Sequence, residues 1–187
     1  EWDNWSPETW EYPSVPVEYS TLLVPTKDST SASFLLQTIH KQRRPVLIIG
    51  GSGTAKTTTA QMFFDANTDH QMLVKKMNFS SATTPGMFQV AVEGELDKRG
   101  GKNFGPPGGK SMTFFLDDLS MPEVNNWGDQ PTLELVRQLV ETRGVCFLDK
   151  DKRGDVKTME DLLFVGAMNH PGGGKNDIPN RMKRLCM

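Results

Sequence analysis

The 187-residue sequence carries 21 Lys and Arg against 23 Asp and Glu, so its formal net charge at pH 7 is -2. Charge-driven binding to nucleic acid needs an excess of basic residues, which this balance does not provide. Hydrophobic residues make up 36% of the chain, enough for a globular core, but no apolar run approaches the roughly 20 residues that cross a bilayer. We therefore expect neither nucleic acid nor a membrane as a partner.

Residues 1–28 are rich in proline and aromatic side chains, which predicts an extended leading segment rather than a helix. The sequence has no initiator methionine and ends without a closing element, so we expect it to be part of a longer polypeptide. Its two cysteines, Cys146 and Cys186, lie far apart and outside any metal-ligand spacing. Free thiols in an intracellular, reducing compartment are the simplest interpretation.

Residues 29–187 alternate between helical and strand patterns. Apolar spacing predicts a first helix at 29–42. The run at 45–50 is continuously apolar, which is typical of a strand buried on both faces of a parallel sheet. The later elements are predicted in this order: helix 56–66, strand 71–80, helix 83–99, strand 111–118, helix 130–144 and strand 161–169.

Two connections complete this organisation. Residues 100–110 form a loop rich in glycine and proline, and residues 145–159 are predicted to form a hairpin around Arg153-Gly154. Strands that alternate with helices predict a parallel sheet with helices on both faces. The expected fold class is therefore α/β.

A glycine-rich loop follows the first predicted strand and opens the second predicted helix. It comes close to the nucleotide-binding pattern G-x-x-x-x-G-K-[ST], with Ala55 in place of the second glycine. Its backbone N–H groups would surround phosphates, Lys56 would reach the β- and γ-phosphates, and the hydroxyl of Thr57 would bind Mg²⁺. The assigned residues are Gly50, Gly51, Ser52, Gly53, Thr54, Ala55, Lys56 and Thr57. The alternative is a glycine-rich turn that binds nothing.

Two acidic residues end the strand predicted at 111–118, in the manner of a Walker B motif. Asp117 is assigned to Mg²⁺, and Asp118 to the polarisation of an attacking water. The second acid of this motif is usually Glu, and Asp118 is shorter by one methylene. We therefore predict Mg²⁺ binding more firmly than fast hydrolysis, with two acids that merely cap a loop as the alternative.

Polar residues beyond these motifs complete the candidate site. Asn169 follows the last predicted strand, where an amide would face the ligand at the sheet edge. A turn before His170 is the alternative for Asn169. Near the end of the chain, Arg181 and Arg184 belong to a basic cluster that is either a solvated turn or an arginine finger for a nucleotide on a neighbouring module.

Five stretches together resemble the AAA+ modules of dynein heavy chains: GGSGTAKT, MNFSSATTP, FFLDDLSMPEVNNWGDQ, RQLVETRG and NHPGGGKNDIPNRMKR. They resemble most the third of the six modules in axonemal heavy chains of the outer-arm type. The resemblance implies that residues 29–187 are the large subdomain of an AAA+ P-loop NTPase, truncated before the small helical subdomain. It also implies an ATP or ADP ligand with Mg²⁺, and slow or regulatory hydrolysis.

Further roles follow from the resemblance alone. Val24 and Pro25 match the segment that packs on the adenine, Asn169 matches a sensor, and Arg184, or failing that Arg181, matches the finger that reaches the preceding module's site. The implied partners are neighbouring AAA+ modules of the same heavy chain, and dynein intermediate and light chains and microtubules through other parts of the chain. The implied location is the cytoplasm and cytoskeleton, in the axoneme of a cilium or flagellum.

Two other functions stay open at this point. A structural ring module could hold nucleotide without hydrolysing it, which the substitutions at Ala55 and Asp118 suggest. A different P-loop enzyme, such as a kinase, is the other alternative, although the sequence shows no evident acceptor site or catalytic-base loop for it.

Overall fold

A computed structural model of the protein describes residues 5–6, 9–12, 18, 22–67, 72–147, 154–172 and 175–186. The helices are α1 (Lys27–Lys41), α2 (Lys56–Ala66), α3 (Pro85–Glu93), α4 (Pro131–Thr142), the short α5 (Asn180–Lys183) and a 3-10 turn (Pro107–Gly109). The strands are β1 (Val46–Ile49), β2 (Met72–Asn78), β3 (Asp97–Gly100), β4 (Asn103–Gly105), β5 (Ser111–Asp117), β6 (Gly144–Cys146), β7 (Val156–Met159) and β8 (Leu162–Met168). No described helix has both the length and the apolar character needed to cross a membrane.

The main sheet, sheet A, has the strand order β1-β8-β5-β2, and all of its pairs are parallel. The pairing of β2 with β5 runs without a shift from Met72 opposite Ser111 to Asn78 opposite Asp117. Parallel strands in register place their carboxyl ends at one edge, and that edge carries the loops described below. The predicted α/β fold with a parallel sheet is confirmed.

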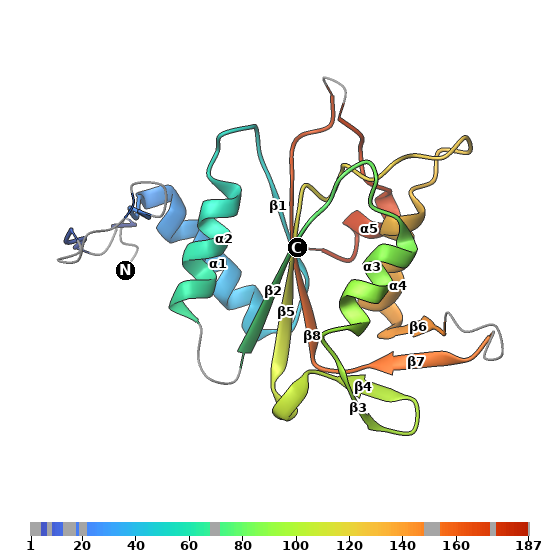
Figure 1. The fold of residues 1–187 in the computed structure, drawn as a ribbon. Helices are drawn as coiled ribbons and strands as arrows, with labels where there is room; N and C mark the ends of the chain where they lie inside the picture. Colours follow the sequence, from blue (N-terminus) through green and yellow to red (C-terminus); the bar gives the residue numbers. More distant parts are fainter. Residues whose placement is uncertain are drawn as a thin grey trace.

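Helices cover both faces of sheet A, as predicted. Figure 1 shows the sheet nearly edge-on, with α1 and α2 on one face and α3 and α4 on the other. Side chains alternate across a strand, so β5 serves two cores: Phe115 packs with Phe64 of α2, whereas Phe114 belongs with Val136 of α4. All four of these side chains are almost completely buried.

Helix boundaries follow local capping chemistry. α1 begins at Lys27, two residues before the predicted start, because Thr26 and Ser29 form a capping box. α3 begins at Pro85, two residues after the predicted start, because Thr84 is the N-cap and its side chain accepts the backbone N–H of Met87. α4 ends at Thr142 because Arg143 takes a left-handed conformation, with φ of 52°.

The helix predicted at 83–99 is wrong beyond Glu93. Residues 97–100 form β3 instead, which pairs antiparallel with β4. The helical spacing of apolar residues stops with α3, and Gly101 and Lys102 make the turn between β3 and β4, with φ of 57° at Gly101. The loop predicted at 100–110 accordingly contains a strand.

A second sheet, sheet B, joins this hairpin to another one. Its strand order is β3-β4-β7-β6, and β6 pairs antiparallel with β7. The hairpin predicted at 145–159 is therefore confirmed; of its predicted turn, Arg153 lies outside the described residues and Gly154 has φ of 89°. Figure 1 shows sheet B beside one end of sheet A, on the side of α3 and α4.

His40, near the end of α1, reaches the central strand β5. Its ring atom Nε2 shares a hydrogen bond of 2.9 Å with the hydroxyl of the fully buried Thr113, and its ring packs against Phe63. Burial lowers the pKa of His40, and the positive charge of Arg43 lowers it further. The folded protein therefore takes up a proton at His40 less readily than the unfolded chain does.

We predict that the free energy of unfolding decreases as the pH is lowered from about 7.5 to about 5.5. In this window His40 takes up a proton in the unfolded chain but resists protonation in the folded protein. Denaturant titrations at the two pH values measure the effect. The control is His40→Gln, since glutamine can still bond to Thr113 but does not titrate. An equal pH dependence of the two proteins would contradict the role given to His40.

Candidate nucleotide-binding site

The loop between β1 and α2 needs its glycines for steric reasons. A Cβ built on Gly50 would lie 2.6 Å from Oγ1 of Thr54, closer than real Cβ contacts come. That hydroxyl in turn donates a 2.9 Å hydrogen bond to the carbonyl of Gly51 and so closes the loop. Gly53 has φ of 77°, a region that side chains other than glycine rarely adopt. The backbone of this loop is therefore held in one conformation by steric contacts and by the Thr54 hydrogen bond.

Ala55, the departure from the nucleotide-binding pattern, takes the conformation that favours a glycine. Its φ of 58° is left-handed, which costs an L-residue roughly 1–2 kcal/mol. The loop nevertheless forms, and α2 starts at the next residue. Ala55 is also the N-cap of α2 and makes no side-chain cap bond, so the first N–H groups of α2 stay available to an anion.

Lys56 links the loop to the end of β8. Its Nζ donates to the carbonyls of Gly50 at 3.1 Å and Gly51 at 2.7 Å, and to Oδ1 of Asn169 at 3.1 Å. Lys56 and Asn169 are 113 residues apart in sequence, and both side chains are half-buried. The predicted phosphate-binding lysine and the predicted sensor amide therefore lie at one place, within reach of the same ligand.

Thr57 and Asp117 form the second link of the site. The Thr57 hydroxyl donates a 2.8 Å hydrogen bond to Oδ2 of Asp117, and Oδ1 of the same carboxylate accepts the backbone N–H of Asp118 at 3.0 Å. A hydroxyl and a carboxylate side by side are hard oxygen donors of the kind that Mg²⁺ binds together with nucleotide phosphates. The residues present therefore fit the ion that the sequence predicts here.

Asp118 has a left-handed backbone, with φ of 53°, and an exposed side chain. Asp and Asn tolerate this conformation better than longer side chains do, because their short polar group can bond locally. The turn after β5 thus offers a physical reason for an aspartate where Glu is usual. It also keeps the carboxylate close to the chain, which limits its reach toward a water.

Val24 and Pro25, predicted to pack on the adenine, lie just before α1. Pro25 lines a cavity of about 580 Å³ whose other walls include Phe34 of α1 and Met62 of α2. Trp5 of the leading segment packs on Phe34, with 5.1 Å between ring centroids. No residue of the loop from 50 to 57 lines this cavity, so the adenine contact of Val24 and Pro25 stays a prediction.

Arg184 and Arg181 lie apart from the loop and interact with α4. Arg184 donates to Glu141 at 3.1 Å, and Arg181 lies 3.7 Å from a carboxylate oxygen of Glu134. Arg137 holds both glutamates from within α4, and its hydrogen bond lowers the pKa of Glu134. Both finger candidates are more than half exposed, so each could turn toward a neighbouring molecule. Their role stays a prediction.

We predict that Ala55→Gly raises the free energy of unfolding by about 0.5–1 kcal/mol, since relief of the left-handed strain outweighs the added entropy of the unfolded chain. Denaturant unfolding of the chain measures this change. The matched control is Ala32→Gly within α1, which should lower stability by about 1 kcal/mol because that backbone is helical. Equal signs for the two variants would show that position 55 is not strained.

Known proteins resemble this chain along almost its whole length. A family model described as "P-loop containing dynein motor region" matches residues 10–187. The sequence is 49% identical over 186 residues to dynein axonemal heavy chain 5 from Mus musculus. It is 47% identical over 188 residues to dynein axonemal heavy chain 8 from Homo sapiens and to the dynein gamma chain of the flagellar outer arm from Chlamydomonas reinhardtii.

Each of these alignments covers 98% of this chain but only 4% of the relative's length. The matched region includes the loop at 50–57, the acidic pair after β5 and Asn169, so the likeness extends over the residues that form the candidate site. The fold, with its parallel sheet and glycine-rich loop, agrees with the family description. The chain belongs to the family of P-loop containing dynein motor regions.

Proposed function

We propose that this chain is an ATP-binding AAA+ module of an axonemal dynein heavy chain, part of a microtubule-based motor that moves cilia or flagella. The observation that carries the proposal is the pairing of Lys56 with Asn169 and of Thr57 with Asp117 at one edge of sheet A. These are the groups that grip phosphates and Mg²⁺ in P-loop proteins. The motif pattern of the sequence further supports the third module of the ring.

The residues of this chain supply most of what the ligand needs. Lys56 exchanges its bonds to carbonyl oxygens for bonds to phosphate, and the free N–H groups at the start of α2 add to the cradle. Thr57 and Asp117 hold Mg²⁺, which neutralises charge on the phosphates when it is bound. Val24 and Pro25 cover the adenine side.

Hydrolysis requires that Asp118 and Asn169 orient a water against the terminal phosphate. The short side chain of Asp118 favours slow or regulatory turnover over fast hydrolysis. Arg184 acts in the site of the preceding module. The second candidate is a structural module that holds nucleotide without hydrolysing it. It is favoured by Ala55, which replaces the second glycine of the nucleotide-binding pattern, and by Asp118, which replaces the usual Glu.

The proposal includes the setting of the whole heavy chain. Neighbouring AAA+ modules of the same polypeptide contact this one, and intermediate chains, light chains and microtubules bind other parts of the heavy chain. One relative is named as an axonemal heavy chain and another as a flagellar outer-arm chain. These names support a place in the axoneme, within the cytoplasm and its cytoskeleton.

We predict that Lys56→Ala weakens nucleotide binding by at least about tenfold, because the phosphate charge loses a charge-assisted hydrogen bond. Fluorescent ATP titration of the heavy chain, with its other nucleotide sites disabled, measures the affinity. The matched control is Lys76→Ala on β2, an exposed lysine, which should leave the affinity unchanged. If the wild-type site itself binds no nucleotide, the proposed function is wrong.

We predict that Asp118→Asn slows hydrolysis at this site by about a hundredfold while ATP affinity stays within about threefold, since general-base catalysis contributes about 10²–10⁴ in rate. Single-turnover measurements on the same heavy chain separate the two quantities. Unchanged turnover in Asp118→Asn would remove the catalytic role. No turnover even in the wild type would favour the structural module.

A further inference from the structure

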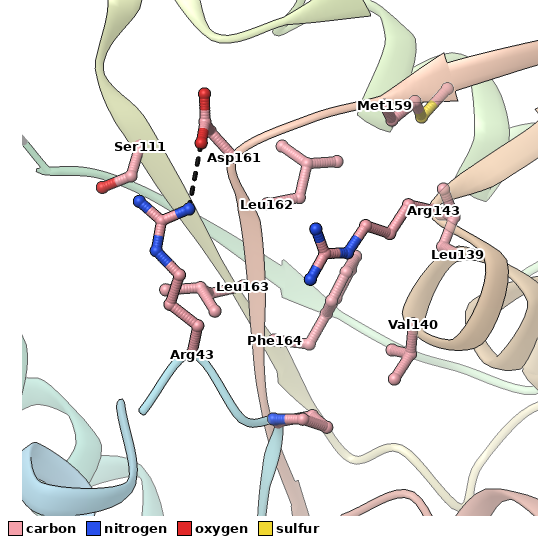
Figure 2. Close-up of a pocket in the computed structure, with 11 residues that line it drawn as sticks. Arg43, Ser111, Leu139, Val140, Arg143, Met159, Asp161, Leu162, Leu163 and Phe164 are labelled. Carbon is pink, nitrogen blue, oxygen red and sulfur yellow. Dashed lines mark hydrogen bonds and ion pairs between the residues drawn. The ribbon is translucent and has the colours of Figure 1, made fainter. Parts of the chain in front are cut away.

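A second pocket lies at the opposite end of sheet A, at the amino ends of β5 and β8. It has a volume of about 60 Å³, and the residues that matter here are Arg43, Arg143, Asp161, Leu162, Phe164 and Leu139. Figure 2 shows the side chains of Arg43 and Arg143 directed toward the β8 residues from opposite sides. No residue of the nucleotide site lines this pocket.

Backbone strain also marks this pocket. In the described part of the chain, the non-glycine residues with positive φ are Arg43, Ala55, Asp118, Arg143 and Asp161. Two of them belong to the nucleotide site, and the other three line this pocket. Each left-handed residue of this kind costs roughly 1–2 kcal/mol, and such residues cluster at ligand sites. The pocket therefore shares this feature with the candidate nucleotide site.

The two arginines occupy helix ends where glycine is the usual residue. Arg43 follows the last turn of α1, and Arg143 is the C-cap of α4. Glycine would end either helix without strain but would bring no side chain. An arginine at each position instead places a guanidinium group next to the amino end of β8.

The acidic group of the pocket is already occupied. Asp161 accepts hydrogen bonds from Arg99 at 2.6 Å and from Arg43 at 3.1 Å, and the Arg99 bond keeps the pKa of Asp161 below its usual range. The Arg143 side chain makes no hydrogen bond or ion pair with any described residue. Its five N–H donors are therefore open to an acceptor that comes from outside.

The apolar residues that line the pocket determine which kind of anion can bind there. Leu162, Phe164 and Leu139 are apolar, and a fully hydrated inorganic anion gains nothing against such a wall. A carboxylate on a short methylene stem can lie with its stem on the apolar wall and its oxygens against a planar guanidinium fork. The volume of about 60 Å³ has room for one such headgroup.

We propose that this pocket binds the carboxylate of an acidic side chain presented by another protein segment. Arg143 provides the main hydrogen bonds. Arg43, held in place by Asp161, provides a second positive charge on the opposite side. The amino end of sheet A is thereby a docking point that is separate from the nucleotide edge.

The test is an NMR titration of the 187-residue chain that follows the Nε–Hε signals of its arginines. The probe is a blocked Gly-Glu-Gly tripeptide, whose only charge is the side-chain carboxylate, and the blocked Gly-Gln-Gly peptide is its neutral match. We expect a saturable shift of the Arg143 signal with the Glu peptide and none with the Gln peptide. The signal of Arg44, an exposed neighbour that does not line the pocket, should not saturate.

Variants make the assignment specific. Arg143→Gln should weaken binding of the Glu peptide at least about tenfold, as judged by the Arg43 signal, whereas Arg44→Gln should leave it unchanged. Arg143→Lys, which keeps the charge but loses the fork, should fall between the two and serves if the Gln variant does not fold. Equal, unsaturated shifts at Arg143 and Arg44 would overturn the proposal. Tighter binding of inorganic phosphate than of the Glu peptide would overturn the carboxylate assignment.

Discussion

Parallel pairing of β8 with both β1 and β5 is the constraint on which the candidate site depends. The register of β8 against β1, from Val46 opposite Val165 to Ile49 opposite Met168, sets the loop at 50–57 beside Asn169. The pairing of β5 with β8 brings Asp117 to the same edge. Because the side-chain period of a strand is two, a slip by one residue would turn Asn169 or Asp117 away from Lys56 and Thr57.

The two buried clusters hold this register in place. Phe114 stacks on Phe164 of β8 at 5.7 Å between ring centroids, on the face covered by α3 and α4. Phe115, on the other face, meets Phe64 of α2 at 5.6 Å. Since α2 starts directly at Lys56, packing of its apolar face against β5 also fixes the position of the lysine. Core packing and site geometry are thus consequences of the same contacts.

Strain is concentrated where the sheet meets its loops. The left-handed non-glycine residues lie at the carboxyl edge, which carries Ala55 and Asp118, and at the opposite end, where Arg43, Arg143 and Asp161 surround the small pocket. A surrounding structure must over-determine such conformations for them to persist. At Asp118 the strain has a chemical consequence, because the turn suits a short acid and so limits how a water can be held.

The sequence by itself determined the parallel α/β fold and the order of the main elements, because buried runs, capping residues and glycine spacing are local signals. It also indicated the loop at 50–57, the acidic pair and Asn169, which the structure brings to one edge of sheet A. It did not reveal β3, whose four residues are all exposed and which forms by pairing with β4. Nor did it predict that Arg184 lies against Glu141, or that Arg43 and Arg143 share a pocket with Asp161. Only the tertiary structure decided these points, because each joins residues that are distant in sequence and carry no pattern of their own.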